Sequence, residues 1–107
     1  MAPEPGGAPF WIPNTDVLVN AAGEMIIKLE LAGLAKDDVE LSVERQTLKV
    51  SGQRPNADDQ GAHYEVLEMH YGRFESVIEV PEEYDLTRAN AVFVNGVVRL
   101  VVPRRTG

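Results

Sequence analysis

The sequence predicts an all-β fold, an antiparallel, immunoglobulin-like β-sandwich of about eight short strands. Three observations support this prediction. Apolar and polar residues alternate with a period of two along most of the chain, no stretch carries a sustained apolar stripe at helical spacing, and turn-forming residues separate the alternating segments. A chain of 107 residues, 44% of them apolar, is long enough for one such domain and too short for two.

Composition sets the beginning of the chain apart. The first thirteen residues hold four of the seven prolines and two glycines, which favours a flexible N-terminal arm over residues 1–13. We expect the folded domain to cover residues 14–103 and a short tail to cover residues 104–107. The arm carries three consecutive apolar residues, whose burial against an edge of the domain would be favourable. These residues are Phe10, Trp11 and Ile12.

The first four expected strands follow from alternation. Residues 16–20 form a short strand, and residues 24–31 place apolar side chains at odd positions, as a half-buried strand requires. Only Ile26 breaks that pattern. Residues 39–44 and 47–51 alternate in the same way, and the two residues between them predict a hairpin.

The middle of the chain predicts a long loop followed by a strand. Residues 55–62 are polar and form an unusually long connection, which is typical of a functional loop. Residues 63–69 give a weak strand signal. Residues 73–80 alternate clearly, and Pro81 ends that strand because proline has no N–H group to donate.

The end of the domain predicts a hairpin of residues 89–94 and 97–102. Asn95 and Gly96 join the two strands, and this pair is the strongest short hairpin signal because both residues tolerate a positive φ. Pro103 closes the last strand. Both strands are apolar on both faces, so either the N-terminal arm or a loop covers them, or they form a groove for an apolar segment of another chain.

The residues predict neither catalysis nor cofactor binding. The chain has no cysteine, its three serines all lie in expected strands, and it has no glycine-rich phosphate loop with a lysine. His63 and His70 are seven residues apart, which would place them on opposite faces of a strand rather than around a metal ion. We therefore predict a protein that is not an enzyme and needs no cofactor or metal.

Charge and hydropathy restrict the partners. The net charge of −7 repels phosphate backbones, so we expect no nucleic acid partner. No apolar run is long enough to span a bilayer, and the first residues lack the features of a signal peptide. We expect a protein of the cytoplasm.

Several motifs occur together in one order. They are WIP at 11–13, LELAGL at 29–34 followed by DDV at 37–39, LKVSGQR at 48–54, GRF at 72–74, VP at 80–81 and AVFVNGVV at 91–98. In this order and spacing the chain resembles the α-crystallin domain of bacterial small heat-shock proteins. The last motif is similar to that family's A-x-x-x-N-G-V-L element, with Val98 in place of leucine. The resemblance covers residues 11–103.

The resemblance implies a function and an assembly. It implies an ATP-independent holdase that captures partly unfolded proteins through apolar surface, and a homodimer in which a loop strand pairs with the first strand of the neighbouring subunit. The implied groove residues are Val39, Leu41, Val43, Val92 and Val94. The implied dimer contacts are Asp16, Val17, Leu18, Val19, His63, Tyr64, Glu65, Val66, Leu67 and Ser76.

The chain also departs from the family pattern. In relatives an I-x-I/V tail motif of a neighbouring subunit occupies the groove and builds large oligomers, and residues 104–107 contain no such motif. This departure argues against large shells but leaves higher oligomers of the dimer open, and we consider Phe10, Trp11 and Ile12 as a substitute occupant of the groove. Ser76 stands where an arginine is usual near the dimer contact. The alternative function is a co-chaperone or adaptor of the related CS-domain class, which binds one folded partner.

Overall fold

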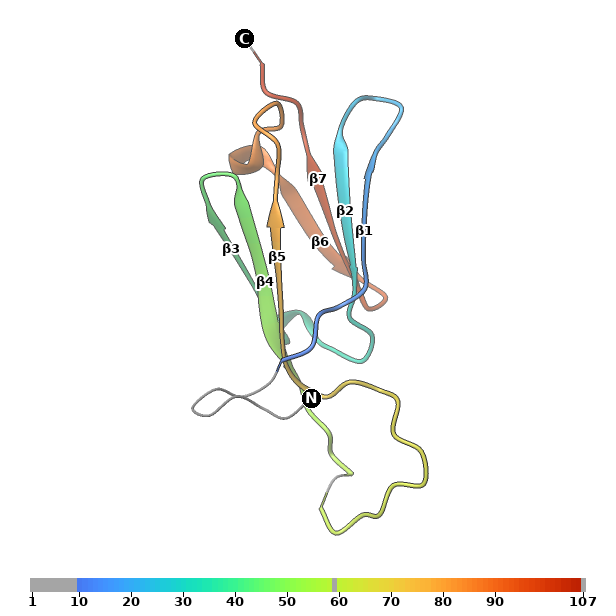
Figure 1. Cartoon of the computed structure of the whole chain (residues 1–107). Coiled ribbons are helices and arrows are strands. Elements are labelled where there is room, and N and C mark those ends of the chain that lie inside the picture. The colour runs from blue at the N-terminus through green and yellow to red at the C-terminus, as the bar shows by residue number, and fades with distance from the viewer. Residues whose placement is uncertain (1–9, 59, 107) are drawn as a thin grey trace.

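Two antiparallel sheets pack face to face, which confirms the predicted β-sandwich (Figure 1). The computed structural model describes residues 10–58 and 60–106, so the predicted arm up to residue 9 lies outside the described residues. One sheet has the strand order β1-β2-β7-β6 and the other the order β3-β4-β5. The strands are β1 (Thr15–Val19), β2 (Met25–Glu30), β3 (Val39–Glu44), β4 (Thr47–Arg54), β5 (Gly72–Glu79), β6 (Asn90–Val94) and β7 (Val97–Val102), and two 3-10 turns are η1 (Lys36–Asp38) and η2 (Leu86–Arg88).

The two predicted hairpins form where the turn residues indicated. Asn95 and Gly96 have φ values of 53° and 77°, and they join β6 to β7 in the register Val94↔Val97. Arg45, with a φ of 56°, opens the turn between β3 and β4. A two-residue loop with positive φ matches the right-handed twist of paired strands, so these turns set both registers.

Glycine is required at one position inside the three-stranded sheet. Val39, Gly52 and Phe74 lie side by side across β3, β4 and β5. A Cβ atom on Gly52 would overlap the backbone oxygen of Asp38 and lie 2.7 Å from the Phe74 ring. The ring therefore packs directly over the backbone of β4.

The core lies between the two sheets and consists mainly of residues that alternation pointed inward, joined by Tyr84 and Leu86 from the connection between β5 and β6. Its central members are fully buried, among them Phe74, Leu29 and Val50. Ile26, which broke the predicted alternation, lies on the outer face of its sheet between Leu18 and Val101 and is nevertheless buried. The outer face of the four-stranded sheet is therefore apolar at its centre.

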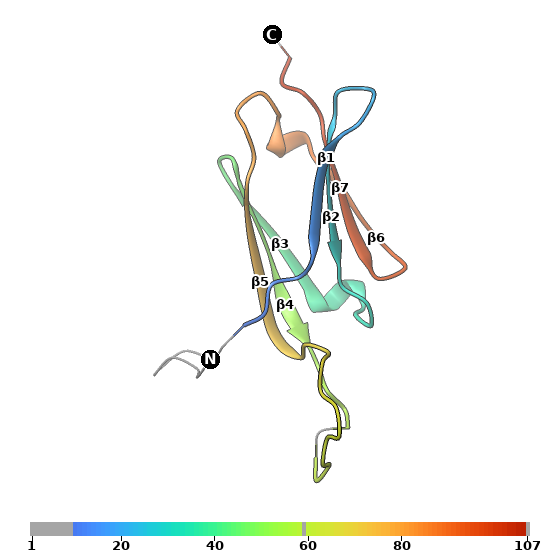
Figure 2. The ribbon, with the colours of Figure 1, turned by 45° about the vertical axis from the view of Figure 1, so that its right-hand side comes forward.

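Seven strands form in residues 10–58 and 60–106, so the weak eighth strand expected at residues 63–69 is absent from this single chain. The connection between β4 and β5 instead extends away from the sandwich as an irregular loop (Figure 2). A strand needs a neighbour to pair its backbone groups, and the loop lies too far from the sheets to find one. Figures 1 and 2 show this loop at one end of the molecule and the C-terminus at the other.

Candidate functional site

A groove of about 380 Å³ lies between β3 and β6. Each of these strands is an edge strand of its sheet, so no further strand covers the side chains at that edge. The groove is lined by Lys36, Asp37, Val39, Leu41, Ala91, Val92, Phe93 and Val98.

The groove combines apolar walls with a charged end. Lys36 and Asp37 come from η1, which directly precedes β3, and the other lining residues are apolar. Leu41 is 41% exposed although it lies opposite the buried Val50 of β4. Apolar side chains beside two strand edges with free backbone groups fit an extended apolar peptide.

The groove differs in part from its predicted composition. The structure brings Val39, Leu41 and Val92 together, as the resemblance implied, but Val43 and Val94 are not among the lining residues. Both lie close to hairpin turns, and both are exposed. Sequence reasoning missed Phe93 and the other inward-facing residues because alternation does not show which strands lie at a sheet edge. At an edge strand, the core face is also the floor of the groove.

The first strand presents a second apolar edge. β1 is the last strand of the four-stranded sheet, and Val17, Leu18 and Val19 are all exposed along it. The connection between β4 and β5 carries further exposed apolar side chains, with Val66 at 72% and Leu67 at 59%. Two apolar segments of one chain thus remain without cover.

The implied dimer residues separate into three places. Asp16 to Val19 lie on β1, and His63 to Leu67 lie in the connection, so the single chain does not bring the two groups together. His63 Nε2 and Glu65 Oε2 lie 3.3 Å apart within the connection, and both side chains are exposed. Ser76 points between the sheets and is buried, which takes it away from the surface. The position implied for Ser76 as a dimer contact does not fit its place in the fold.

Trp11, from the apolar triplet of the arm, docks on β5 and not in the groove. The N–H group of Trp11 donates to the Arg73 carbonyl at 3.0 Å, and the Glu75 N–H group donates to the Trp11 carbonyl at 3.1 Å. This bridge extends the three-stranded sheet at the edge opposite β3. Phe10 and Ile12 remain exposed beside it. The hypothesis that the triplet fills the groove is therefore wrong for Trp11, because the backbone of Trp11 finds a free strand edge at β5.

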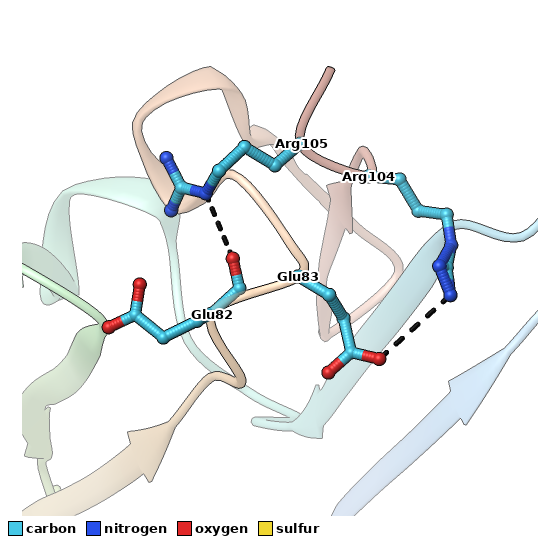
Figure 3. A network of polar contacts seen from close by, with 4 residues as sticks. All are labelled: Glu82, Glu83, Arg104 and Arg105. Atoms are coloured by element: carbon cyan, nitrogen blue, oxygen red, sulfur yellow. Dashed lines mark hydrogen bonds and ion pairs between the residues drawn. The ribbon is translucent and has the colours of Figure 1, made fainter. Parts of the chain in front are cut away.

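The residues expected to form a tail also contact the domain. Arg105 donates through Nε to the Glu82 carbonyl at 2.9 Å, and Arg104 forms an ion pair of 3.9 Å with Glu83 (Figure 3). The Arg105 side chain donates in addition to Gln46 Oε1 at 2.9 Å. Arg104 and Arg105 therefore contact the domain although they follow the boundary expected at residue 103.

Ionic and membrane-related features add no further site. Within residues 10–58 and 60–106, no three His, Asp or Glu side chains gather as a metal ion would require. The same part of the chain contains no helix with the length and hydropathy of a membrane span.

Comparison with known proteins gives consistent similarities. The sequence profile of the Hsp20/alpha crystallin family matches residues 17–107. The chain is 26% identical, over 88% of its length, to small heat shock protein C2 of Rickettsia felis, and 35% identical, over 72% of its length, to a 22.7 kDa class IV heat shock protein of Pisum sativum. It spans 61% and 40% of the lengths of these two relatives.

The fold has a close match among solved structures. A small heat-shock protein from Xylella fastidiosa superimposes with a TM-score of 0.81 at 23% identity, over 92% of this chain and 91% of that one. At this identity the likeness concerns the fold.

Proposed function

Because the chain belongs to the Hsp20/alpha crystallin family, we propose that it is an ATP-independent holdase that binds partly unfolded proteins and prevents their aggregation. The observation that supports this proposal most directly is the open apolar groove between β3 and β6. No enzymatic step and no cofactor are part of the proposal.

The groove suits weak, reversible capture. Burying one apolar side chain contributes about 1.5–3 kcal/mol, and association must first offset the lost freedom of the two molecules. Two or three client side chains against residues such as Leu41 and Val92 therefore give a complex that forms and dissociates readily. A protein that holds clients until other chaperones refold them requires such reversibility.

Light scattering of a heat-aggregating model protein tests the holdase, in the absence of ATP. We expect suppression for several unrelated clients, and weaker suppression by the variant Leu41→Glu, whose carboxylate would be buried against the client. Val77→Glu is the matched control, because Val77 is an exposed apolar residue of β5 outside the groove. Unchanged suppression by Leu41→Glu would contradict the role of the groove, and an effect on one folded partner alone would favour the adaptor function.

A second copy of the chain is the proposed occupant of the β1 edge. β1 offers free backbone groups beside three exposed apolar residues, and the β4–β5 connection supplies an apolar segment that is uncovered in the single chain. Pairing the connection of one copy with β1 of the other would cover both segments at once. The proposal is therefore a homodimer formed by mutual exchange of the connections.

Chromatography with light scattering measures this assembly. We expect twice the chain mass of 11.8 kDa for the wild type and a shift toward the single-chain mass for Leu67→Glu. Val94→Glu is the control, because Val94 is equally exposed, at 58% against 59%, but lies on β6. A wild type of single-chain mass would contradict the dimer, and a double mass that neither Leu67→Glu nor Val66→Glu changes would contradict pairing through the connection.

A further inference from the structure

The ring of Trp11 touches both ends of the β4–β5 connection. At the end of β4, where the connection begins, the Arg54 guanidinium carbon lies 4.4 Å from the ring centroid. Where the connection ends, the His70 ring stacks on Trp11 with the ring centroids 5.7 Å apart and an interplanar angle of 20°, and the Gly72 carbonyl accepts a 3.2 Å hydrogen bond from Trp11 Nε1. One side chain therefore joins the residues where the connection leaves the sandwich and where it returns.

The Arg54 side chain is held in part by this contact. Its Nε atom is buried and has no hydrogen-bond acceptor among the described residues. Because this nitrogen makes no hydrogen bond, the attraction between the guanidinium and the Trp11 ring contributes to the position of the side chain. Removing the ring would therefore release Arg54 as well as His70.

The connection has no comparable tie elsewhere. In its described residues between 55 and 71, each hydrogen bond or close His–Glu contact joins two residues of the connection itself. The pairs are Asn56 with Tyr64, Asn56 with Asp58, His63 with Glu65, and Tyr71 with Met69. These contacts stiffen the connection internally but do not orient it on the sandwich. Its direction is set at its two ends, where Trp11 lies.

We propose that Trp11 is a positioning residue that clips the two ends of the β4–β5 connection together and so orients this connection for pairing with a second copy. The clip is a property of the single chain. Its consequence for assembly rests on the proposed dimer. The arm and the β4–β5 connection are thereby coupled, since the connection is no longer held in one orientation when Trp11 leaves β5.

Spin labels measure the clip directly in the full chain, which has no cysteine of its own. Labels at Ala62→Cys on the connection and Val77→Cys on β5, diluted with unlabelled protein, report the distance distribution between the two segments. We expect a narrow distribution for the wild type and a broad one for Trp11→Ala. Phe10→Ala is the matched control, because Phe10 is the neighbouring aromatic residue and is 51% exposed, and it should leave the distribution narrow.

His70→Ala provides a second variant in case Trp11→Ala unfolds. It removes the stacked ring while the backbone bridge of Trp11 to β5 remains, so we expect an intermediate width. Trp11 is the only tryptophan, and its fluorescence emission should move to longer wavelength as the ring gains water. Equal widths in the wild type, His70→Ala and a folded Trp11→Ala would overturn the clip.

The assembly half of the proposal has a separate readout. The dissociation constant of the dimer should rise by on the order of tenfold in Trp11→Ala, because the connection must then become ordered as the two copies pair. A broad distribution with unchanged dimer affinity would overturn the role in assembly and leave the clip. A wild type of single-chain mass would overturn the dimer itself, and the widths would still decide the clip.

Discussion

At the scale of single residues, Gln46 shows how much of the fold rests on one amide. It sits in the β3–β4 turn, and its Nε2 group donates to the carbonyls of Val80, Pro81 and Tyr84 at 3.1, 2.9 and 3.0 Å. Its Oε1 atom accepts from Arg105. A single side chain thus ties the turn to a segment more than thirty residues away, and no local pattern in the sequence indicates such a contact.

Replacing Gln46 should lower stability more than its partly exposed position suggests. Gln46→Ala removes the side-chain donor of the Val80 and Pro81 carbonyls and one of the acceptors of Arg105, which costs about 1–3 kcal/mol of unfolding free energy. Urea unfolding followed by circular dichroism measures the loss. Gln53→Ala, at an exposed position of β4, should change the free energy by less than about 0.5 kcal/mol. Equal stabilities of the two variants would contradict this account.

Asp85 carries the residue-scale prediction for pH. The Thr87 hydroxyl donates to Asp85 Oδ1 at 2.6 Å, and this bond is the main reason that the pKa of Asp85 lies below its ordinary value of 3.8. A lowered folded-state pKa favours the folded state above that ordinary value, and the gain disappears as the pH falls through the folded pKa. In Thr87→Val the pKa of Asp85 should rise toward 3.8, as carbon-detected NMR titration would measure, whereas Thr15→Val should leave it unchanged.

At the scale of strands and turns, alternation and turn chemistry predicted most of the architecture. The β6–β7 hairpin was predictable because Asn95 and Gly96 need no distant contact to favour their turn. Burial of the apolar triplet against an edge of the domain was predicted, but the choice of β5 by Trp11 was not, because it depends on which strand edges remain free after the sheets have formed. Phe93 was not predicted as a groove residue for the same reason, since alternation cannot tell an edge strand from a central one.

The three-stranded sheet gives an element-scale prediction at Gly52. In Gly52→Ala the added methyl group would force Phe74 or the backbone of Asp38 to shift, and overpacking of this kind costs about 1–3 kcal/mol. Ser51→Ala, one residue away, adds no atoms and should cost less. Thermal and urea unfolding of the two variants compare them, and a Gly52→Ala variant as stable as Ser51→Ala would show that the ring has room to move.

At the scale of the whole molecule, the sandwich leaves different edges for different tasks. The groove uses β3 and β6, the proposed dimer uses β1 and the β4–β5 connection, and the Trp11 bridge uses β5. Each edge strand is thus assigned to one surface, so the surfaces do not compete for the same backbone groups.

Separate surfaces predict separate effects. Leu41→Glu should weaken the suppression of client aggregation and leave the mass of the assembly unchanged, whereas Leu67→Glu should lower the mass of the assembly. The double variant should show both changes with the sizes measured singly, because distant sites without shared contacts are close to additive. A mass change in Leu41→Glu would show instead that the groove takes part in assembly.

The contacts of Arg105 with residues 82–84 have a practical consequence for handling the protein. A chemical tether attached beyond Arg105 would leave the sandwich from an anchored point at the end remote from the β4–β5 connection (Figure 1). Chains immobilised on a sensor surface in this way would all present the same end to solution, with the β4–β5 connection and the Trp11 clip facing the analyte.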